Sequence, residues 1–251
     1  PRLSRAARPL LDRFDRRRLR LIGRPGARLL DVGAGRGRFV AAARAAGYRA
    51  EGIEPSLRGV TAARDAYGVS LRHENLAGAD VAPGSVEVIT IWHVLEHLDD
   101  PGRALATLAG WLEPGGAILV GVPNLASLQA RIGGARWYHL DVPRHRTHFT
   151  ARGVVLALEA AGLEPVRVTH VLAEHNPFGM WQSLVSRLTR RPSYLYNLLK
   201  RNAPLRSRDL PITVAGLGLL PAAAVLELAA GLARRGGTVA VLARRPGARE
   251  D

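Results

Sequence analysis

Histidines gather at two places in this 251-residue chain, and histidine is the side chain best suited to moving protons at neutral pH. The stretch 92–101 (WHVLEHLDDP) carries two histidines and a glutamate within five residues, and the stretch 136–150 (RWYHLDVPRHRTHFT) carries three histidines. Such groups suit general acid–base catalysis. The candidate catalytic residues are His97, His145 and His148, of which we rank His145 and His97 first.

A third stretch has the composition of a nucleotide-binding turn. The apolar run 29–32 (LLDV) is followed by glycines at alternate positions, Gly33, Gly35 and Gly37. Glycine lets the backbone approach a ligand closely, and the N-terminus of the helix expected next favours an anionic group. The dinucleotide pattern Gly-x-Gly-x-x-Gly would need a third glycine where Arg38 stands, so the spacing does not match it.

The elements that position these residues alternate between strand and helix. Strands are expected at 29–32, 49–54, 69–72, 86–91, 116–122, 164–170 and 237–244. This alternation is typical of an α/β protein with a parallel, doubly wound sheet, whose ligands bind at the carboxyl ends of the strands. Glu54 ends the second of these strands, where an acid can accept hydrogen bonds from both ribose hydroxyls of a nucleoside. It is not needed as a helix cap, because Pro55 and Ser56 can start the next helix.

In this order the stretches resemble the motifs of class I S-adenosylmethionine (SAM)-dependent methyltransferases of the small-molecule, ubiquinone-methyltransferase-like type. The matching motifs are 31–37, 53–55, 94–97 with 100–101, and 112–116, within roughly residues 26–175. The resemblance implies a Rossmann-like sheet of seven strands whose last strand is antiparallel. It also implies SAM as the cofactor and S-adenosylhomocysteine as its product.

The resemblance further implies which residues bind the cofactor. They are Asp31 before the turn, Gly33, Ala34, Gly35 and Gly37 around the methionine, Glu54 on the ribose with Pro55 after it, Asn75 and Leu76 at the adenine, and Trp92 and His93 beside the methionine end. The chain departs from the family pattern at Val86-Glu87, where an aromatic residue followed by aspartate is usual.

A metal site is the alternative use of the histidines. Glu96, His97 and a histidine of the 136–150 loop together offer ligands for a divalent ion. Related quinone-pathway enzymes have a richer acidic cluster here, and His93 stands where one of those acids would be. We therefore expect no metal.

The net charge of +15 is concentrated outside the expected core. Residues 1–28 hold ten arginines and two aspartates, and residues 187–208 hold seven basic residues and no acid. These patches suit phosphate-bearing partners, either nucleic acid or an anionic membrane surface, unless they are simply solvated faces. The absence of cysteine fits the cytoplasm and excludes a thiol nucleophile, and the arginine-rich start lacks the apolar core of a secretory signal.

About sixty residues separate the last two expected strands, where a simple class I fold has a short hairpin. We expect four parts: a basic amphipathic helix in 1–25, a SAM-binding domain in 26–176, a helical insertion in 177–235, and the last strand and tail in 236–251. The segment 211–233 is apolar apart from Glu227. A single membrane crossing conflicts with the return of the chain to the sheet, so we expect a helical hairpin that is a cap, a dimer contact or a membrane-interface attachment.

The main functional hypothesis is a SAM-dependent methyltransferase (EC 2.1.1.-) acting on a small, lipid-linked or glycan-type acceptor, most simply at oxygen. A nucleic-acid methyltransferase is the second hypothesis; the Asn/Asp-Pro-Pro-aromatic motif of amino-methylating enzymes does not follow the fourth strand, so we expect no nucleic-acid partner. The third is a non-catalytic SAM-binding module. We expect a cytoplasmic protein, peripheral at the inner face of a membrane if the insertion attaches there.

Overall fold

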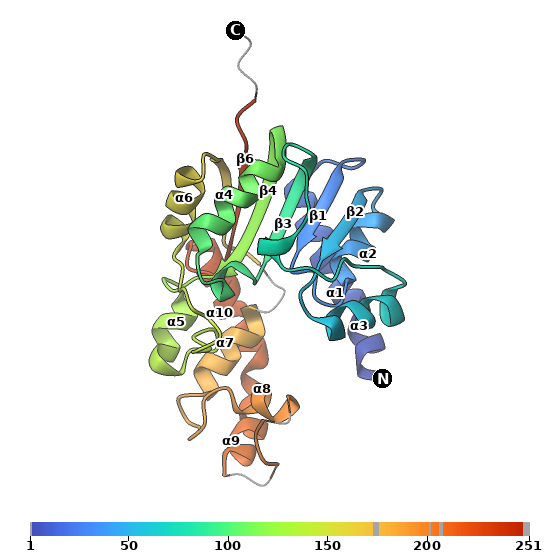
Figure 1. Ribbon diagram of the computed structural model, residues 1–251. Helices are drawn as coiled ribbons and strands as arrows, with labels where there is room; N and C mark the ends of the chain where they lie inside the picture. The colour runs from blue at the N-terminus through green and yellow to red at the C-terminus, as the bar shows by residue number, and fades with distance from the viewer. Residues whose placement is uncertain (1, 173–175, 201, 206–207, 248–251) are drawn as a thin grey trace. The chain divides into compact units, whose positions relative to one another are not determined.

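The computed structural model describes residues 2–172, 176–200, 202–205 and 208–247, and for residues 2–11 the backbone alone. In this part of the chain six strands form one sheet in the order β2-β1-β3-β4-β6-β5 (Figure 1). The strands are β1 (Arg28–Val32), β2 (Arg49–Ile53), β3 (Val86–Trp92), β4 (Leu112–Pro123), β5 (Glu164–Thr169) and β6 (Thr238–Arg244). The α/β, doubly wound sheet expected from the sequence is confirmed.

Strands β1 to β4 are parallel, and their register brings their carboxyl ends to one edge: Val32 pairs with Ile53 on β2 and with Ile91 on β3. Strand β6 runs the other way. The N–H of Gly115, near the start of β4, bonds to the carbonyl of Arg245 after β6, and the N–H of Asn124, after β4, bonds to the carbonyl of Gly237 before β6. The expectation of an antiparallel last strand is confirmed.

The expected strand count of seven is wrong for the described residues. Segment 69–72 makes a single parallel bridge, between Arg72 and Ile53. The Arg72 side chain turns to Glu74 (Nη2–Oε2 2.6 Å) and to the carbonyl of Asp80 (2.7 Å). These contacts hold the following residues in a turn, so the segment does not continue along β2.

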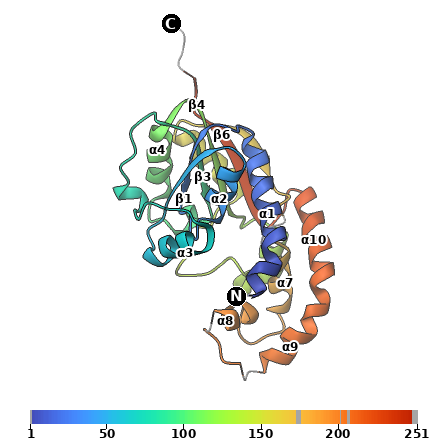
Figure 2. The ribbon, with the colours of Figure 1, turned by 90° about the vertical axis from the view of Figure 1, so that its right-hand side faces the viewer.

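Helices cover both faces of the sheet, and Figure 2 shows α1 (Arg2–Ile22) and α4 (Pro101–Trp111) on opposite sides of the strands. Helix α1 contacts α2 (Arg38–Ala45), which contacts α3 (Leu57–Tyr67). Helix α6 (Ala151–Ala160) precedes β5. Ser56 caps α3 by accepting the N–H of Gly59, as the sequence led us to expect, and Asp100 caps α4 by accepting the N–H of Arg103.

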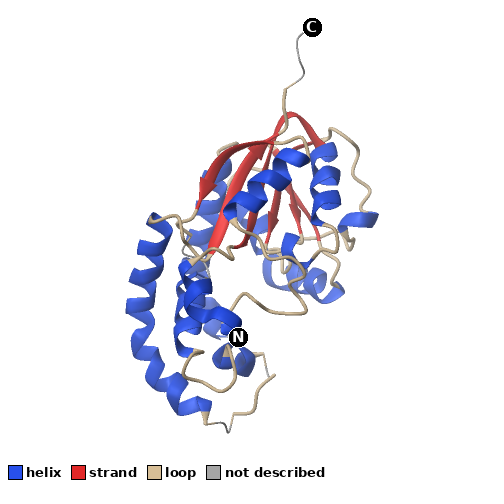
Figure 3. Cartoon of the chain, turned by 90° about the vertical axis from the view of Figure 1, so that its left-hand side faces the viewer, coloured by secondary structure: helices blue, strands red, loops and turns tan. Residues whose placement is uncertain are grey.

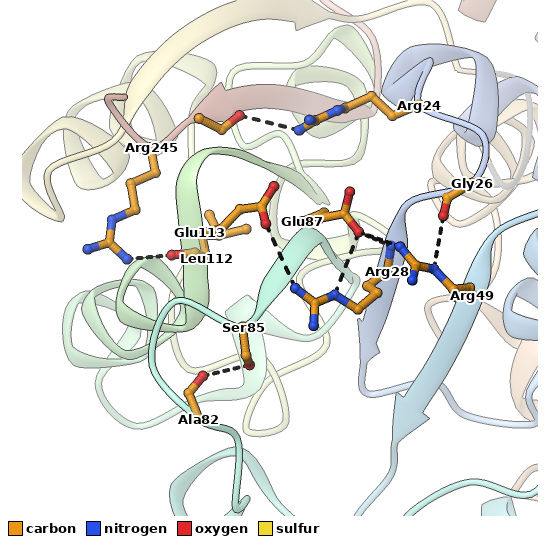
Figure 4. A network of polar contacts seen from close by, with 11 residues as sticks. Arg24, Gly26, Arg28, Arg49, Ala82, Ser85, Glu87, Leu112, Glu113 and Arg245 are labelled. Atoms are coloured by element: carbon orange, nitrogen blue, oxygen red, sulfur yellow. Dashed lines mark hydrogen bonds and ion pairs between the residues drawn. The ribbon is translucent and has the colours of Figure 1, made fainter. Parts of the chain in front are cut away.

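Glu87, the departure from the family pattern, ties the amino ends of three strands together (Figure 4). Its Oε2 accepts the N–H of Arg28 at 2.8 Å and lies 3.0 Å from Arg49 Nη2. The hydrogen bond from the Arg28 backbone, with the positive charges of Arg49, Arg28 and Arg24, holds the pKa of Glu87 below its ordinary value. Glu87 therefore links neighbouring strands at their amino ends, away from the carboxyl ends where ligands bind.

The chain divides into two compact units. Unit 1 comprises Pro1–Gly121, Arg152–Val168 and Val241–Asp251, and unit 2 comprises Val122–Ala151 and Thr169–Ala240. The described part of unit 2 between β5 and β6 consists of helices and their connections (Figure 3). The α-helices of unit 2 are α5 (Leu128–Gly133), which precedes β5, and α7 (Asn176–Val185), α8 (Tyr194–Leu199), α9 (Asp209–Gly216) and α10 (Leu220–Leu232), which follow it.

Unit 2 has a hydrophobic core of its own, formed where α7 and α10 lie side by side (Figures 1 and 2). Met180, Trp181 and Val185 of α7 meet Ala223 and Ala230 of α10, all nearly fully buried. The alanines of α10 are small and leave room for the large side chains of α7. Large residues on one helix therefore pack against small residues on the other.

Candidate cofactor and catalytic site

The glycine-rich turn after β1 adopts a backbone that favours glycine. Gly33, Gly35 and Gly37 have φ values of 72°, 57° and 73°. A Cβ added at Gly33 would lie 2.4 Å from Val94 Cγ2, and one added at Gly37 would lie 2.8 Å from Ala63 Cβ. Conformation and space both require glycine there, and α2 begins directly after the turn.

Glu54 faces this turn from the carboxyl end of β2. Its Oε2 accepts the N–H of Gly35 at 2.7 Å, and its Oε1 accepts the N–H of Ser56 at 2.9 Å. The side chain is nearly buried, yet each oxygen keeps a second lone pair for another donor. The structure thus brings together the acid and the glycine turn that the sequence predicted as parts of one site.

Asp31 lies at the same edge and is held by β3 and α1. Thr90 Oγ1 donates to its Oδ1 at 2.5 Å, and Arg18 Nη2 lies 3.7 Å from the same oxygen. The Arg18 guanidinium carbon is 3.8 Å from the ring centre of Phe39 and 4.4 Å from that of Trp92. A buried cation therefore lies beside Asp31, stacked between two aromatic rings.

Sequence reasoning missed Arg18 as a site residue. The helical period of residues 9–22 places Arg18 on the apolar stripe with Phe14 and Ile22, both buried, but sequence reasoning gave Arg18 no role there. The helix itself runs over Arg2–Ile22, and the place of Arg18 on its stripe was the available signal, because a charged side chain at a buried position is unusual unless it is paired. Asp15, also buried on α1, pairs with Arg38 at 3.3 Å and helps fix α1 against the start of α2.

The end of β3 positions the next predicted residues. His93 adopts a positive φ of 53°, and its Nδ1 lies 3.1 Å from Oε1 of the buried Glu96. In the described part of the chain, Trp92 Nε1 is buried without a hydrogen-bond partner. His97 follows on the short 3₁₀ segment Leu95–His97, and its side chain is exposed. An indole N–H without a partner, on a ring stacked against Arg18, is a donor that a bound ligand can use.

The remaining predicted cofactor residues lie beyond β2. Pro55 follows Glu54 directly, and its carbonyl lies 3.0 Å from Nε2 of His73. Asn75 is exposed and caps the 3₁₀ segment Leu76–Gly78 through a 2.8 Å hydrogen bond from the N–H of Gly78, and Leu76 is half-buried. The Asn75 oxygen thus serves as the cap of its own turn.

The loop histidines belong to unit 2 and are held by backbone carbonyls. The buried His145 points Nδ1 at the carbonyl oxygen of His139 at 2.7 Å, and His148 points Nε2 at the carbonyl oxygen of Leu140 at 2.9 Å. A carbonyl only accepts, so the proton of each neutral ring lies on the nitrogen facing it. His145 therefore presents Nε2 as its basic nitrogen, 3.9 Å from Oδ2 of Asp141.

A mostly parallel sheet with a glycine turn after β1 and an acid after β2 defines a Rossmann-like protein that binds a nucleoside cofactor. The chain matches the family described as "Methyltransferase domain" over residues 3–168. It belongs to this family and is a class I SAM-dependent methyltransferase, as the sequence motifs indicated. SAM is accordingly its cofactor.

Individual relatives agree with this assignment. The chain is 32% identical over 167 residues to the ubiquinone biosynthesis O-methyltransferase of Ralstonia nicotianae, covering 61% of this chain and 68% of the relative. A SAM-dependent methyltransferase from Archaeoglobus fulgidus superposes with a TM-score of 0.60 at 19% identity, covering 94% of each chain. The 4+2 cyclase SpnF superposes with a TM-score of 0.62 at 20% identity, covering 94% of this chain and 81% of that one. At these identities the two structures show the fold alone.

Proposed function

We propose that the protein transfers the methyl group of SAM to a hydroxyl oxygen of a small acceptor of lipid-linked or glycan type, with His145 as the general base. The observation that carries the proposal is the placement of the buried His145, whose Nδ1 lies 2.7 Å from the carbonyl oxygen of His139. The proton of the neutral ring then lies on Nδ1, and Nε2 is the basic nitrogen. The name of the Ralstonia relative, an O-methyltransferase, supports oxygen as the accepting atom.

SAM, when bound, supplies a methyl group already activated by its sulfonium. The chain's residues need only to bind, to align and, for a hydroxyl acceptor, to take up a proton. His145 Nε2 is the acceptor for that proton, and Asp141 at 3.9 Å stabilises the imidazolium that results. Asp141 is itself oriented by Arg144, whose Nη2 lies 2.6 Å from its Oδ1. His97 is the second candidate for the same role.

We propose that different residues bind different parts of SAM. We assign the ribose hydroxyls to Glu54, whose two oxygens are already aimed by backbone donors. We assign the methionine carboxylate to Arg18, a buried cation held between aromatic rings beside Asp31. Trp92 Nε1 supplies a further donor at that end.

The acceptor class is tested by labelling. A lysate is incubated with the protein and SAM carrying an isotopic methyl group, and the product is sorted into lipid, nucleic acid and water-soluble small molecules. The proposal expects label in lipid or small molecule, with the methyl present as a methoxyl group by NMR. Label in nucleic acid, or on nitrogen or carbon, overturns it.

The base is tested with a matched pair from the same loop, His145→Gln and His148→Gln. We expect His145→Gln to lower kcat by about 10²- to 10⁴-fold while the Kd for SAM is unchanged, because general-base catalysis contributes about that much. His148→Gln, which also loses one hydrogen bond to a carbonyl, serves as the control and should change kcat by only a few-fold. If the two substitutions lower kcat equally, His145 is not the general base.

A further inference from the structure

The helical run through α9, the 3₁₀ segment Leu217–Leu219 and α10 carries large apolar side chains on its outer face and small or polar residues on its inner face. Its inward side chains are small or polar: Thr213, Gly216, Ala223, Glu227, Ala230 and Gly231. Its outward side chains are large and apolar, with exposures from 37% to 71%: Val214, Leu217, Leu219, Leu220, Val225, Leu228 and Leu232. A helix in contact with water has the reverse pattern.

The inner face is fixed against the rest of unit 2. Glu227 accepts hydrogen bonds from Gln129 Nε2 at 3.0 Å and from the N–H of Gly237 at 2.7 Å. Trp181 Nε1 of α7 donates to the carbonyl of Gly216 at 2.6 Å. The run is long and apolar enough to cross a bilayer, and only 17% of its most apolar window is buried. Because one face is bound to protein, it is the other face that lacks a partner in the described chain.

The charges around this outer face all have one sign. Between Asp209 and Arg234 the only ionisable side chain is Glu227, which is buried. Asp209 is also buried, and its two oxygens accept the N–H groups of Arg190 and Arg191. Exposed cations flank the run: Arg187, Arg190, Arg191, Lys200 and Arg208 on one side in sequence and Arg234 and Arg235 on the other.

From this arrangement we propose that the outer face of α9–α10 lies in the headgroup and acyl boundary of an anionic membrane. Leucines bury in that layer while arginines at both ends of the run reach the phosphates. A second copy of the chain fits less well, because parallel and antiparallel pairing of two such runs both bring cations together. The inference concerns attachment of unit 2 and goes beyond the proposed methyl transfer.

The experiment is vesicle co-sedimentation of the intact protein. We expect binding to vesicles of equal parts phosphatidylcholine and phosphatidylglycerol, weakened by salt, and little binding to phosphatidylcholine alone. Leu228→Gln should weaken the partition about tenfold, because a buried leucine contributes about that much. Arg208→Gln or Arg234→Gln should weaken it about fivefold each.

The matched control is Leu156→Gln on α6, since Leu156 and Leu228 are both 52% exposed. It should bind vesicles as the unsubstituted protein does, and thermal melts check that each variant is folded. Equal loss in the two leucine variants, equal binding to neutral and anionic vesicles, or no binding overturns the proposal. Retention on vesicles after alkaline carbonate would mean a spanning segment and overturns it too. Self-association abolished by Leu228→Gln, with vesicle binding unchanged, assigns the face to a second copy. None of these readouts measures methylation, so they test membrane attachment independently of the proposed methyl transfer.

Discussion

Replacing Glu54 by glutamine tests the cofactor site most directly. The carboxylate accepts one backbone N–H on each oxygen, from Gly35 and from Ser56. Glutamine keeps one accepting oxygen and turns an NH₂ donor toward the other N–H. One donor of the turn then lacks a partner, and the remaining ribose hydrogen bond goes to a neutral acceptor instead of a charged one.

The two losses have separate magnitudes. A buried donor without a partner costs about 1–3 kcal/mol, and exchanging a charged for a neutral hydrogen-bond acceptor costs about 1 kcal/mol. Only the second loss changes the binding free energy, because the first is present with and without ligand, so the Kd for SAM should be roughly fivefold higher. The first loss also appears without ligand, as a lower melting temperature, whereas the second appears only in binding.

Calorimetric titration with S-adenosylhomocysteine and with its 2′-deoxy analogue separates these effects. The unsubstituted protein should lose affinity when the 2′-hydroxyl is removed, and Glu54→Gln should lose less, because its hydrogen bond to that hydroxyl is already weaker. Glu51→Gln, an exposed glutamate on the same strand, is the control and should bind both ligands normally. If Glu54→Gln binds the cofactor within twofold of the unsubstituted protein, or discriminates the deoxy analogue as strongly, the assignment of the ribose to Glu54 is refuted.

Three further predictions follow from the same contacts. Arg18→Met should raise the Kd for SAM about 10- to 100-fold, since hydrogen bonds to charged groups contribute about 1.5–3 kcal/mol, and leave the Kd for adenosine unchanged in calorimetry, with the exposed Arg16→Met as control. The pKa of Glu87 is held low, so its contribution to the unfolding free energy is present above the ordinary carboxyl pKa and lost as pH falls; urea titrations of Glu87→Gln should show a shallower loss in acid. Burial raises the pKa of Glu227 to about 7 from 4.5, so the folded state keeps a proton that the unfolded state loses. The unfolding free energy should fall by at most about 3 kcal/mol between pH 4.5 and 7 and then level off, and Glu227→Gln should remove this slope.

The cofactor edge was predictable because its signals are local. Each signal lies within a few neighbouring residues: the strand β1, the three alternate glycines after it, and the acid after β2. Because parallel strands end at the same edge of a sheet, these signals also predict that the residues lie close together. The strand at 69–72 failed for a tertiary reason: its length and composition suit a strand, but Arg72 is engaged by Glu74 and the chain turns away. Hydrophobic pattern does not encode such a side-chain preference.

Contacts between residues far apart in the sequence could not be predicted from the hydrophobic pattern or from motif spacing. The capture of Arg18 between Phe39 and Trp92 joins segments of α1, α2 and β3, and no spacing rule links them. The segment 211–233 was recognised as apolar, yet its sequence could not tell which face is bound. That required Glu227, whose hydrogen bonds to Gln129 and Gly237 fix the inward side.

The division into units carries a consequence for how such an enzyme can vary. Every residue predicted to bind SAM lies in unit 1, whereas His145, His148 and the apolar face of α10 lie in unit 2. The activated methyl group demands the same binding chemistry whatever the acceptor, so unit 1 has little freedom to change. The choice of acceptor and the attachment to a membrane can change without any change in the glycine turn. We therefore expect substitutions in unit 1 to act mainly on the Kd for SAM, and substitutions in the loop and helices of unit 2 to act on which acceptor is used and where.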